Sequence, residues 1–155
     1  MIARLDHVVL TTQHRERCVD FYTRVLGMRL ETFGQGRIAF RFGDQKINLH
    51  EAGREFEPKA TRPTPGALDL CFLAAEPLDA VIRHLEEPGV PIELGPVPRT
   101  GATGAIRSVY VRDPDGNLVE IAETVRATVR VTPAPLSWRL PILRARAPPD
   151  GQNVG

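Results

Sequence analysis

The chain contains two copies of one strand, helix and strand unit, 62 positions apart. Residues 5–11 and 67–73 are both apolar runs, and each carries one polar residue at the same place, so that His7 falls on Asp69. The same offset places Gly27 on Gly89. A chain built twice from one unit must bury its open faces between the copies. A polar residue at matching places is therefore a candidate for a site between them.

Hydrophobic spacing and turn signals extend each copy to the order βαβββ. Spacings of three and four predict helices, and period-two alternation predicts strands. In the first unit we expect a helix over 12–26 and strands over 28–33, 37–42 and 46–50. In the second unit we expect a strand over 68–74, then a helix with Pro77 at its N1 position, and then strands over 90–94, 108–112 and 118–122. The Gly- and Pro-rich stretch 95–104 predicts a loop, and within it 99–104 a mobile flap over a pocket.

The expected organisation is one α+β domain over residues 1–124. Its first module runs to about residue 54, a Pro-rich connector covers 55–66, and the second module covers 67–124. Residues 125–155 hold five Pro, five Arg and one acid, which predicts a mobile tail whose Trp138 is able to fold back onto the domain.

Composition excludes several function classes. The net charge is +1, and since the last 31 residues contribute +4, the domain itself carries −3 and has no basic stripe for nucleic acid. No run approaches the roughly 20 apolar residues that cross a bilayer, so a cytoplasmic protein without a membrane partner is expected. Cys18 and Cys71 lack CxxC spacing and are expected to be buried thiols.

Period-two alternation sorts the strand residues into two faces. One set is apolar and suits the face that the helices cover: Val8, Leu10, Ile47, Leu49, Val109, Val111, Val119 and Ile121. The opposite set is polar and rich in metal-ligand types: His7, Asn48, His50, Ser108, Tyr110 and Glu120.

The opposite set predicts a metal site if the two sheets curve toward one another. Laying the closing hairpins on each other at an offset of 70 places Phe40 on Tyr110 and His50 on Glu120, while the opening strands contribute His7 and Asp69. Imidazole nitrogen with carboxylate oxygen suits a divalent Zn, Mn, Fe, Ni or Co ion, and an open site of this kind is typical of catalysis.

Three motifs resemble the vicinal oxygen chelate superfamily, which includes glyoxalase I, bleomycin-resistance proteins and extradiol dioxygenases. They are LDHVVL at 5–10, FYTRVLGM at 21–28 and DPDGNLVEI at 113–121, and the resemblance covers residues 3–124. Residues 45–50 together with 63–66 are further similar to a subgroup of glyoxalase domain-containing or virulence-type proteins.

The resemblance implies a cupped, barrel-like mixed sheet made of two βαβββ modules with helices outside, and a homodimer. It implies that metal ligands come from the first and last strands of both units, so His7 and Glu120 carry over. The last strand of the first unit offers Asn48 or His50, depending on register; His50 is favoured because imidazole is the better ligand. The family usually has His where this chain has Asp69.

These observations predict a metal-dependent enzyme acting on a small molecule with vicinal oxygens, by glyoxalase-like lyase or isomerase chemistry or by dioxygenation. Glu120 is expected to shuttle a proton, and Asn48, Arg107 and Tyr110 to contact substrate, with Arg41 as a further candidate. The alternative is a metal-free protein of the bleomycin-resistance kind that sequesters a drug or metabolite. Its site would be lined by aromatics, here Phe40, Phe42, Tyr110 and Trp138. A third possibility is a degenerate module that serves as a dimerisation partner.

Overall fold

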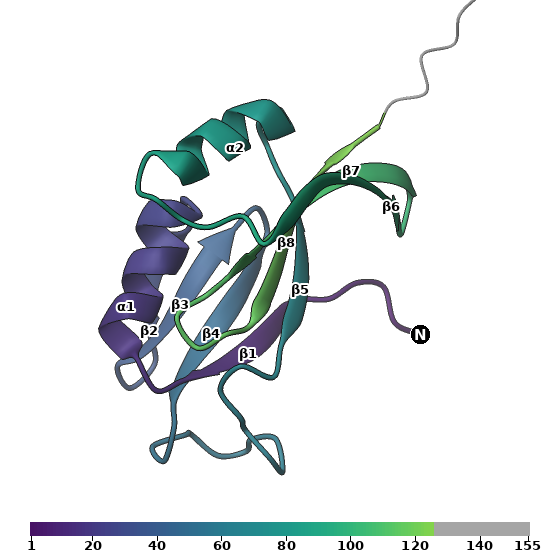
Figure 1. Cartoon of the computed structure of the whole chain (residues 1–155). Helices are drawn as coiled ribbons and strands as arrows, with labels where there is room; N and C mark the ends of the chain where they lie inside the picture. Colours follow the sequence, from purple (N-terminus) through teal and green to yellow (C-terminus); the bar gives the residue numbers. More distant parts are fainter. Residues whose placement is uncertain (126–155) are drawn as a thin grey trace, which may run out of the picture.

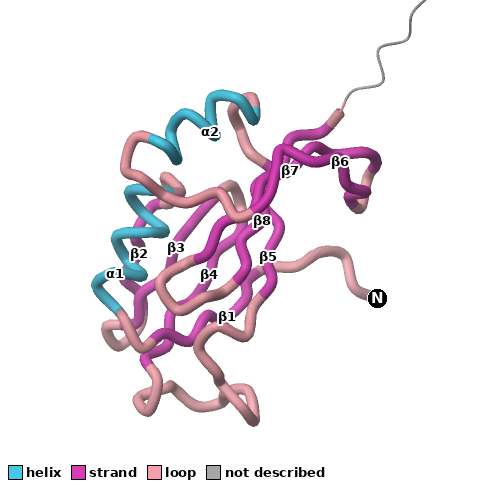
Figure 2. The backbone as a smooth tube through the Cα atoms, in the orientation of Figure 1, coloured by secondary structure: helices cyan, strands magenta, loops and turns pink. Residues whose placement is uncertain are grey.

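The chain forms two four-stranded mixed sheets with both helices on one side (Figures 1 and 2). This computed structural model describes residues 1–125. The expected tail and its Trp138 lie outside the described residues. Within the described part of the chain, no helix is long and apolar enough to cross a membrane.

The first sheet holds the first unit. Its elements are β1 (His7–Thr12), α1 (Arg15–Asp20) continued by the π-helical turn η1 (Phe21–Val25), β2 (Arg29–Phe33), β3 (Arg37–Phe42) and β4 (Gln45–Glu51). The strand order is β1-β4-β3-β2, with β1 parallel to β4. Thr12, expected to open the helix, ends β1, and its hydroxyl accepts the N–H of His14 just before α1. Gly27, at φ 69°, supplies the left-handed residue expected after the helix.

The second sheet repeats this topology. Its elements are β5 (Asp69–Leu73), α2 (Leu78–Glu86), β6 (Leu94–Gly101), β7 (Gly104–Arg112) and β8 (Leu118–Thr124), in the order β5-β8-β7-β6. β5 is parallel to β8. The expected duplication of a βαβββ module is confirmed, as is the α+β class; the two sheets do not close into one barrel. Pro77 occupies the N-cap rather than the N1 position of α2.

The loop expected at 95–104 is wrong, because this stretch forms nearly all of β6 and its turn into β7; the flap expected at 99–104 stays a prediction. β6 pairs with β7 down to Gly101 opposite Gly104, with an irregularity between Leu94 and Val97. Pro96 and Pro98 fit here because β6 is the edge strand and has no second neighbour that needs their missing N–H groups. The strand expected at 90–94 is absent apart from its last residue, Leu94.

The core lies between the helices and the sheets. Tyr22 of η1 stacks on Phe40 of β3 with ring centroids 4.8 Å apart, and both side chains are fully buried. The apolar set predicted for the helix-covered face belongs to this core or packs against it.

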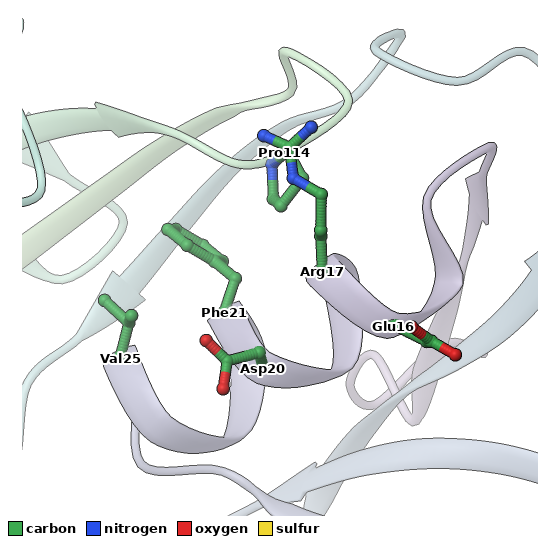
Figure 3. A pocket seen from close by; sticks show the side chains of 6 residues that line it. All are labelled: Glu16, Arg17, Asp20, Phe21, Val25 and Pro114. Carbon is green, nitrogen blue, oxygen red and sulfur yellow. The ribbon is translucent and has the colours of Figure 1, made fainter.

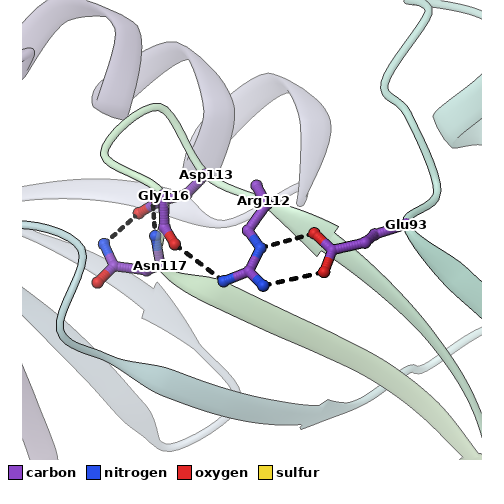
Figure 4. Close-up of polar contacts among 5 residues, drawn as sticks. All are labelled: Glu93, Arg112, Asp113, Gly116 and Asn117. Carbon is purple, nitrogen blue, oxygen red and sulfur yellow. Dashed lines mark hydrogen bonds and ion pairs between the residues drawn. The ribbon is translucent and has the colours of Figure 1, made fainter.

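The β7–β8 turn ties the second unit to the first. The Asp113 carboxylate accepts the Tyr22 hydroxyl at 3.1 Å, and Asp115 accepts the Thr12 hydroxyl. Asn117 also donates to Asp113, and the adjacent Arg112 pairs with both oxygens of Glu93 (Figure 4). The turn motif therefore fixes the two modules against each other, as well as joining β7 to β8.

Candidate functional site

The face of each sheet that points away from the helices gathers the predicted site residues; we call it the helix-distal face. The residues of this face are identified from strand alternation and register, because residues paired across neighbouring strands point to the same face. On the first sheet it carries His7, Val9, Thr11, Arg37, Ala39, Arg41, Lys46, Asn48 and His50. On the second sheet it carries Asp69, Cys71, Leu73, Ser108, Tyr110 and Glu120.

The register makes Asn48, not His50, the counterpart of Glu120. Val9 pairs with Asn48 across β1 and β4, and its equivalent Cys71 pairs with Glu120 across β5 and β8. The alignment that placed His50 on Glu120 is therefore wrong by two residues. The error leaves the face unchanged because side chains alternate with a period of two. The register also makes Ala39, rather than Phe40, the counterpart of Tyr110, because Ala39 pairs with Asn48 and Tyr110 pairs with Glu120.

Four buried polar atoms on this face have no hydrogen-bond partner among residues 1–125. They are Asn48 Oδ1 and His50 Nδ1 on the first sheet, and Ser108 Oγ and Glu120 Oε1 on the second. Unpaired buried polar groups cost about 1–3 kcal/mol each, so proteins seldom keep them without a reason. The two counterparts, Asn48 and Glu120, both have an oxygen free for a ligand.

His7 opens β1 at the edge of this face. Its side chain is 44% exposed, and Nδ1 lies 2.7 Å from Oδ1 of Asp6. The hydrogen bond to His7 holds the pKa of Asp6 below its usual value. A carboxylate at one ring nitrogen orients an imidazole and leaves the other nitrogen for a ligand. Asp69 holds the equivalent position at the start of β5 and is exposed.

Glu120 lies between Cys71 and Tyr110 in the second sheet. Cys71 is exposed, contrary to expectation, whereas Cys18 is buried. Desolvation, and then the Glu120 charge, raise the pKa of Cys71 to about 11, so its thiol is protonated at neutral pH. The Tyr110 hydroxyl accepts Nε of Arg99 at 2.9 Å.

Several other expected residues lie elsewhere. Arg107 has the opposite parity and pairs with Asp79 of α2 at 2.7 Å and with Glu123 at 2.9 Å, so it is held on the helix side. Arg41 is on the helix-distal face but is engaged by Glu31 at 2.6 Å. Phe40 is in the core, and Phe42 packs edge-on against Phe72 of the second unit.

One chain does not bring the candidate ligands together. Among residues 1–125, no group of three or more His, Cys, Asp or Glu side chains is placed to hold a metal ion. The expected convergence of His7, His50, Asp69 and Glu120 is therefore not formed within a single copy. Asp69 and Glu120 belong to one sheet, and His7 and His50 to the other.

Two hollows lie away from these residues. A cavity of about 1000 Å³ runs between the units and is lined mainly by apolar side chains, among them Met28, Phe42, Phe72 and Leu85. A shallower one of about 390 Å³ lies along α1 and η1, beside Pro114 (Figure 3). Neither is lined by His7, Asn48, His50, Asp69 or Glu120.

The comparisons with known proteins agree with the fold. The family described as the Glyoxalase/Bleomycin resistance protein/Dioxygenase superfamily matches residues 4–121. Virulence protein STM3117 of Salmonella typhimurium strain LT2 is 53% identical over 81% of this chain and 87% of its own length; its crystal structure superposes with a TM-score of 0.79, covering 81% of this chain and 99% of that one. Glyoxalase domain-containing protein RDO1 of Mycosarcoma maydis is 53% identical over 78% of this chain and 68% of its own length. Lactoylglutathione lyase from Agrobacterium tumefaciens shares the fold, with a TM-score of 0.62 and 24% identity over 79% of this chain and 95% of that one.

Proposed function

Because the chain belongs to the glyoxalase/bleomycin resistance protein/dioxygenase superfamily, we propose that it is a metal-dependent enzyme acting on a small molecule with vicinal oxygens. The reaction is of the glyoxalase-like lyase or isomerase kind, or a dioxygenation. The observation that carries the proposal is the pair of unpaired buried oxygens on Asn48 and Glu120, at equivalent positions of the two sheets.

The donor set fits a first-row divalent ion. His7 offers the imidazole nitrogen left free by Asp6, Asn48 an amide oxygen, and Asp69 and Glu120 carboxylate oxygens. Nitrogen and oxygen donors of this kind suit Zn, Mn, Fe, Ni or Co and leave positions for substrate. We therefore assign Asn48 rather than His50 to the metal-facing position.

A second copy of the chain completes the site in this proposal. The donors are divided between two sheets that do not gather them in one copy. The helix-distal faces also leave apolar side chains exposed: Val9 at 41%, Leu94 at 47% and Leu73 at 60%. Packing the first sheet of one copy against the second sheet of another covers this surface and brings His7 and Asn48 opposite Asp69 and Glu120.

The chemistry follows from these residues. A divalent ion at this place supplies Lewis-acid polarisation of two adjacent substrate oxygens. Glu120 Oε1, which has no hydrogen-bond partner within the described part of the chain, accepts a proton from the substrate and returns it. Tyr110, opposite Glu120 and bonded to Arg99, positions a polar group of the substrate.

The metal-free binding protein is the weaker candidate, because two of its expected aromatics, Phe40 and Phe42, pack inside the molecule. Of the expected aromatics within residues 1–125, only Tyr110 lies on the helix-distal face.

Metal analysis tests the proposal. Purified full-length protein is dialysed against Zn²⁺, Mn²⁺, Co²⁺ or Ni²⁺, and bound metal and association state are measured by elemental analysis and sedimentation velocity. We expect one ion per chain in a dimer, with at least tenfold weaker binding in His7→Ala and Glu120→Gln. His84→Ala, which changes an exposed helix residue, is the matched control. Absence of stoichiometric metal, or equal binding by all variants, contradicts the proposal.

A further inference from the structure

A second polar cluster lies where β3, β4 and the connector meet. The Phe56 ring of the connector packs against the His50 ring at a steep angle, with the ring centroids 5.7 Å apart. The Arg37 guanidinium carbon lies 4.7 Å from the centre of the Phe56 ring. Arg37 and His50 belong to the helix-distal face of neighbouring strands. The connector therefore turns back over the end of the first sheet and holds these two side chains in place.

His50 is a buried group that lacks a partner. His50 is only 8% exposed, and its Nδ1 makes no hydrogen bond with any of residues 1–125. A buried polar atom without a partner is destabilising, and the described part of the chain supplies no group to satisfy this one. A ligand atom is therefore the natural partner for the ring.

Arg37 is a cation that lacks an acidic partner. Within residues 1–125 it forms no ion pair, whereas Arg41 on the same strand pairs with Glu31. The carboxylate of this cluster, Glu55, is already engaged: its side chain is 7% exposed, accepts Lys59 Nζ at 3.0 Å and accepts the N–H of Gly53 at 2.9 Å. The Arg37 charge is thus held over Phe56 with no protein anion bound to it.

We propose that Arg37 and His50 form a subsite for a carboxylate group of the small-molecule substrate. A guanidinium offers paired donors in the plane that a carboxylate requires, and a ring N–H adds a third. A single positive charge matches a carboxylate better than a doubly charged phosphate. This inference rests on the proposed function in one respect, that substrate binds on the helix-distal face.

The strand geometry narrows the substrate class further. His50 and Asn48 are two residues apart on one strand face, and this separation is about 6.8 Å. The carboxylate therefore lies several bonds away from the vicinal oxygens that react near Asn48. The substrate is a small acid with its carboxylate at one end and its reacting oxygens at the other.

A matched pair of probes tests the subsite. Binding of 4-fluorobenzoate and of the uncharged 4-fluorobenzamide is measured by fluorine NMR on full-length protein stripped of metal with a chelator. We expect wild type to prefer the carboxylate by at least tenfold, and Arg37→Met, which keeps an unbranched side chain against Phe56, to bind both probes equally. Arg29→Met is the control, because it removes the same charge from an exposed residue of the same sheet.

Each alternative result has a defined meaning. Loss of the preference for the carboxylate in Arg29→Met as well would show a general charge effect and would overturn the subsite. An unchanged preference in Arg37→Met would also overturn it. So would a wild type that binds both probes equally well or binds neither. His50→Gln keeps a side-chain N–H and is expected to retain most of the preference, whereas His50→Leu is expected to weaken it severalfold; identical behaviour of the two contradicts the part assigned to His50. Since metal is absent throughout, this test can fail while metal binding succeeds, and the reverse.

Discussion

The two sheets share one strand order but differ in what covers their helix-distal faces. On the first sheet the connector covers the end of β4, and Glu31 engages Arg41. On the second sheet Cys71 and Leu73 are exposed. Duplication has thus kept the backbone, while the connector that follows the first unit makes the two faces unequal. Part of the first face is therefore covered by its own chain, whereas Cys71 and Leu73 leave the second face more exposed.

The two cysteines give the largest expected contrast. Cys71 is exposed on the open face and Cys18 is fully buried in the core, so Cys18 reacts only after local opening. We expect a disulfide reagent to modify Cys71 of the dissociated chain about a hundredfold faster or more, since a core site usually opens at a cost of about 3 kcal/mol or above. The rates are measured by absorbance on Cys18→Ala and Cys71→Ala. Similar rates would mean that the second face is covered in the free protein.

The inner faces differ in the size of the side chain at equivalent positions. Phe40 in β3 corresponds to Val111 in β7, since they pair with Ile47 and Val119 respectively, and both are fully buried. Phe40 also stacks on Tyr22. We expect Phe40→Ala to lower the free energy of unfolding by about 3–5 kcal/mol and Val111→Ala by about 2 kcal/mol, measured by urea denaturation. Equal losses would show that the second unit, despite its smaller side chain, is as tightly packed as the first.

Much of the fold followed from the sequence because strand alternation is a local signal. The faces of His7, Asn48 and Glu120 were predicted from strand alternation alone. The same alternation places Cys71 on the face of Asp69 and Glu120, and the prediction that Cys71 is buried did not use this signal. A register error of two residues keeps parity, so alternation could not choose between Asn48 and His50.

Two other features depend on contacts that no local pattern encodes. The β6 strand contains Pro96 and Pro98, which predict a loop unless the strand is known to be at an edge. The contact of Phe56 with His50 arises from an aperiodic connector that folds back on its own sheet. The convergence of His7, His50, Asp69 and Glu120 that was expected from strand parity is not formed within one copy, because parity fixes the face of each side chain but not the distance between the two sheets.

The edge strands differ as well, because β6 is irregular where β2 is regular. A Cβ at Gly95 would lie 2.6 Å from the Ser108 oxygen and 2.9 Å from Val109 Cα, both backbone atoms. Gly43, in the β3–β4 turn, has open space around it and a φ of +50°. Thermal and urea unfolding should show a loss of about 3 kcal/mol for Gly95→Ala and about 1 kcal/mol for Gly43→Ala. A Gly95→Ala protein as stable as the Gly43→Ala protein would mean that β6 can shift away from β7 at little cost.

Acid should loosen the connector of the first sheet through Glu55, and this is the smallest effect expected. The Gly53 N–H and Lys59 lower the pKa of Glu55 from 4.5 to about 2. Because the folded-state pKa lies below the unfolded one, the carboxylate stabilises the fold fully above pH 4.5, and this contribution declines as the pH falls toward 2. Urea unfolding measured from pH 7 to pH 3 should therefore show that Glu55→Gln loses less stability in acid than wild type does. Glu57→Gln is the control and should follow wild type, because the Glu57 side chain is 74% exposed. Since the Glu55 charge acts on His50, an acid response unchanged by Glu55→Gln would mean that the connector is not anchored through this carboxylate. The contrast between a covered and an open face would then rest on Phe56 alone.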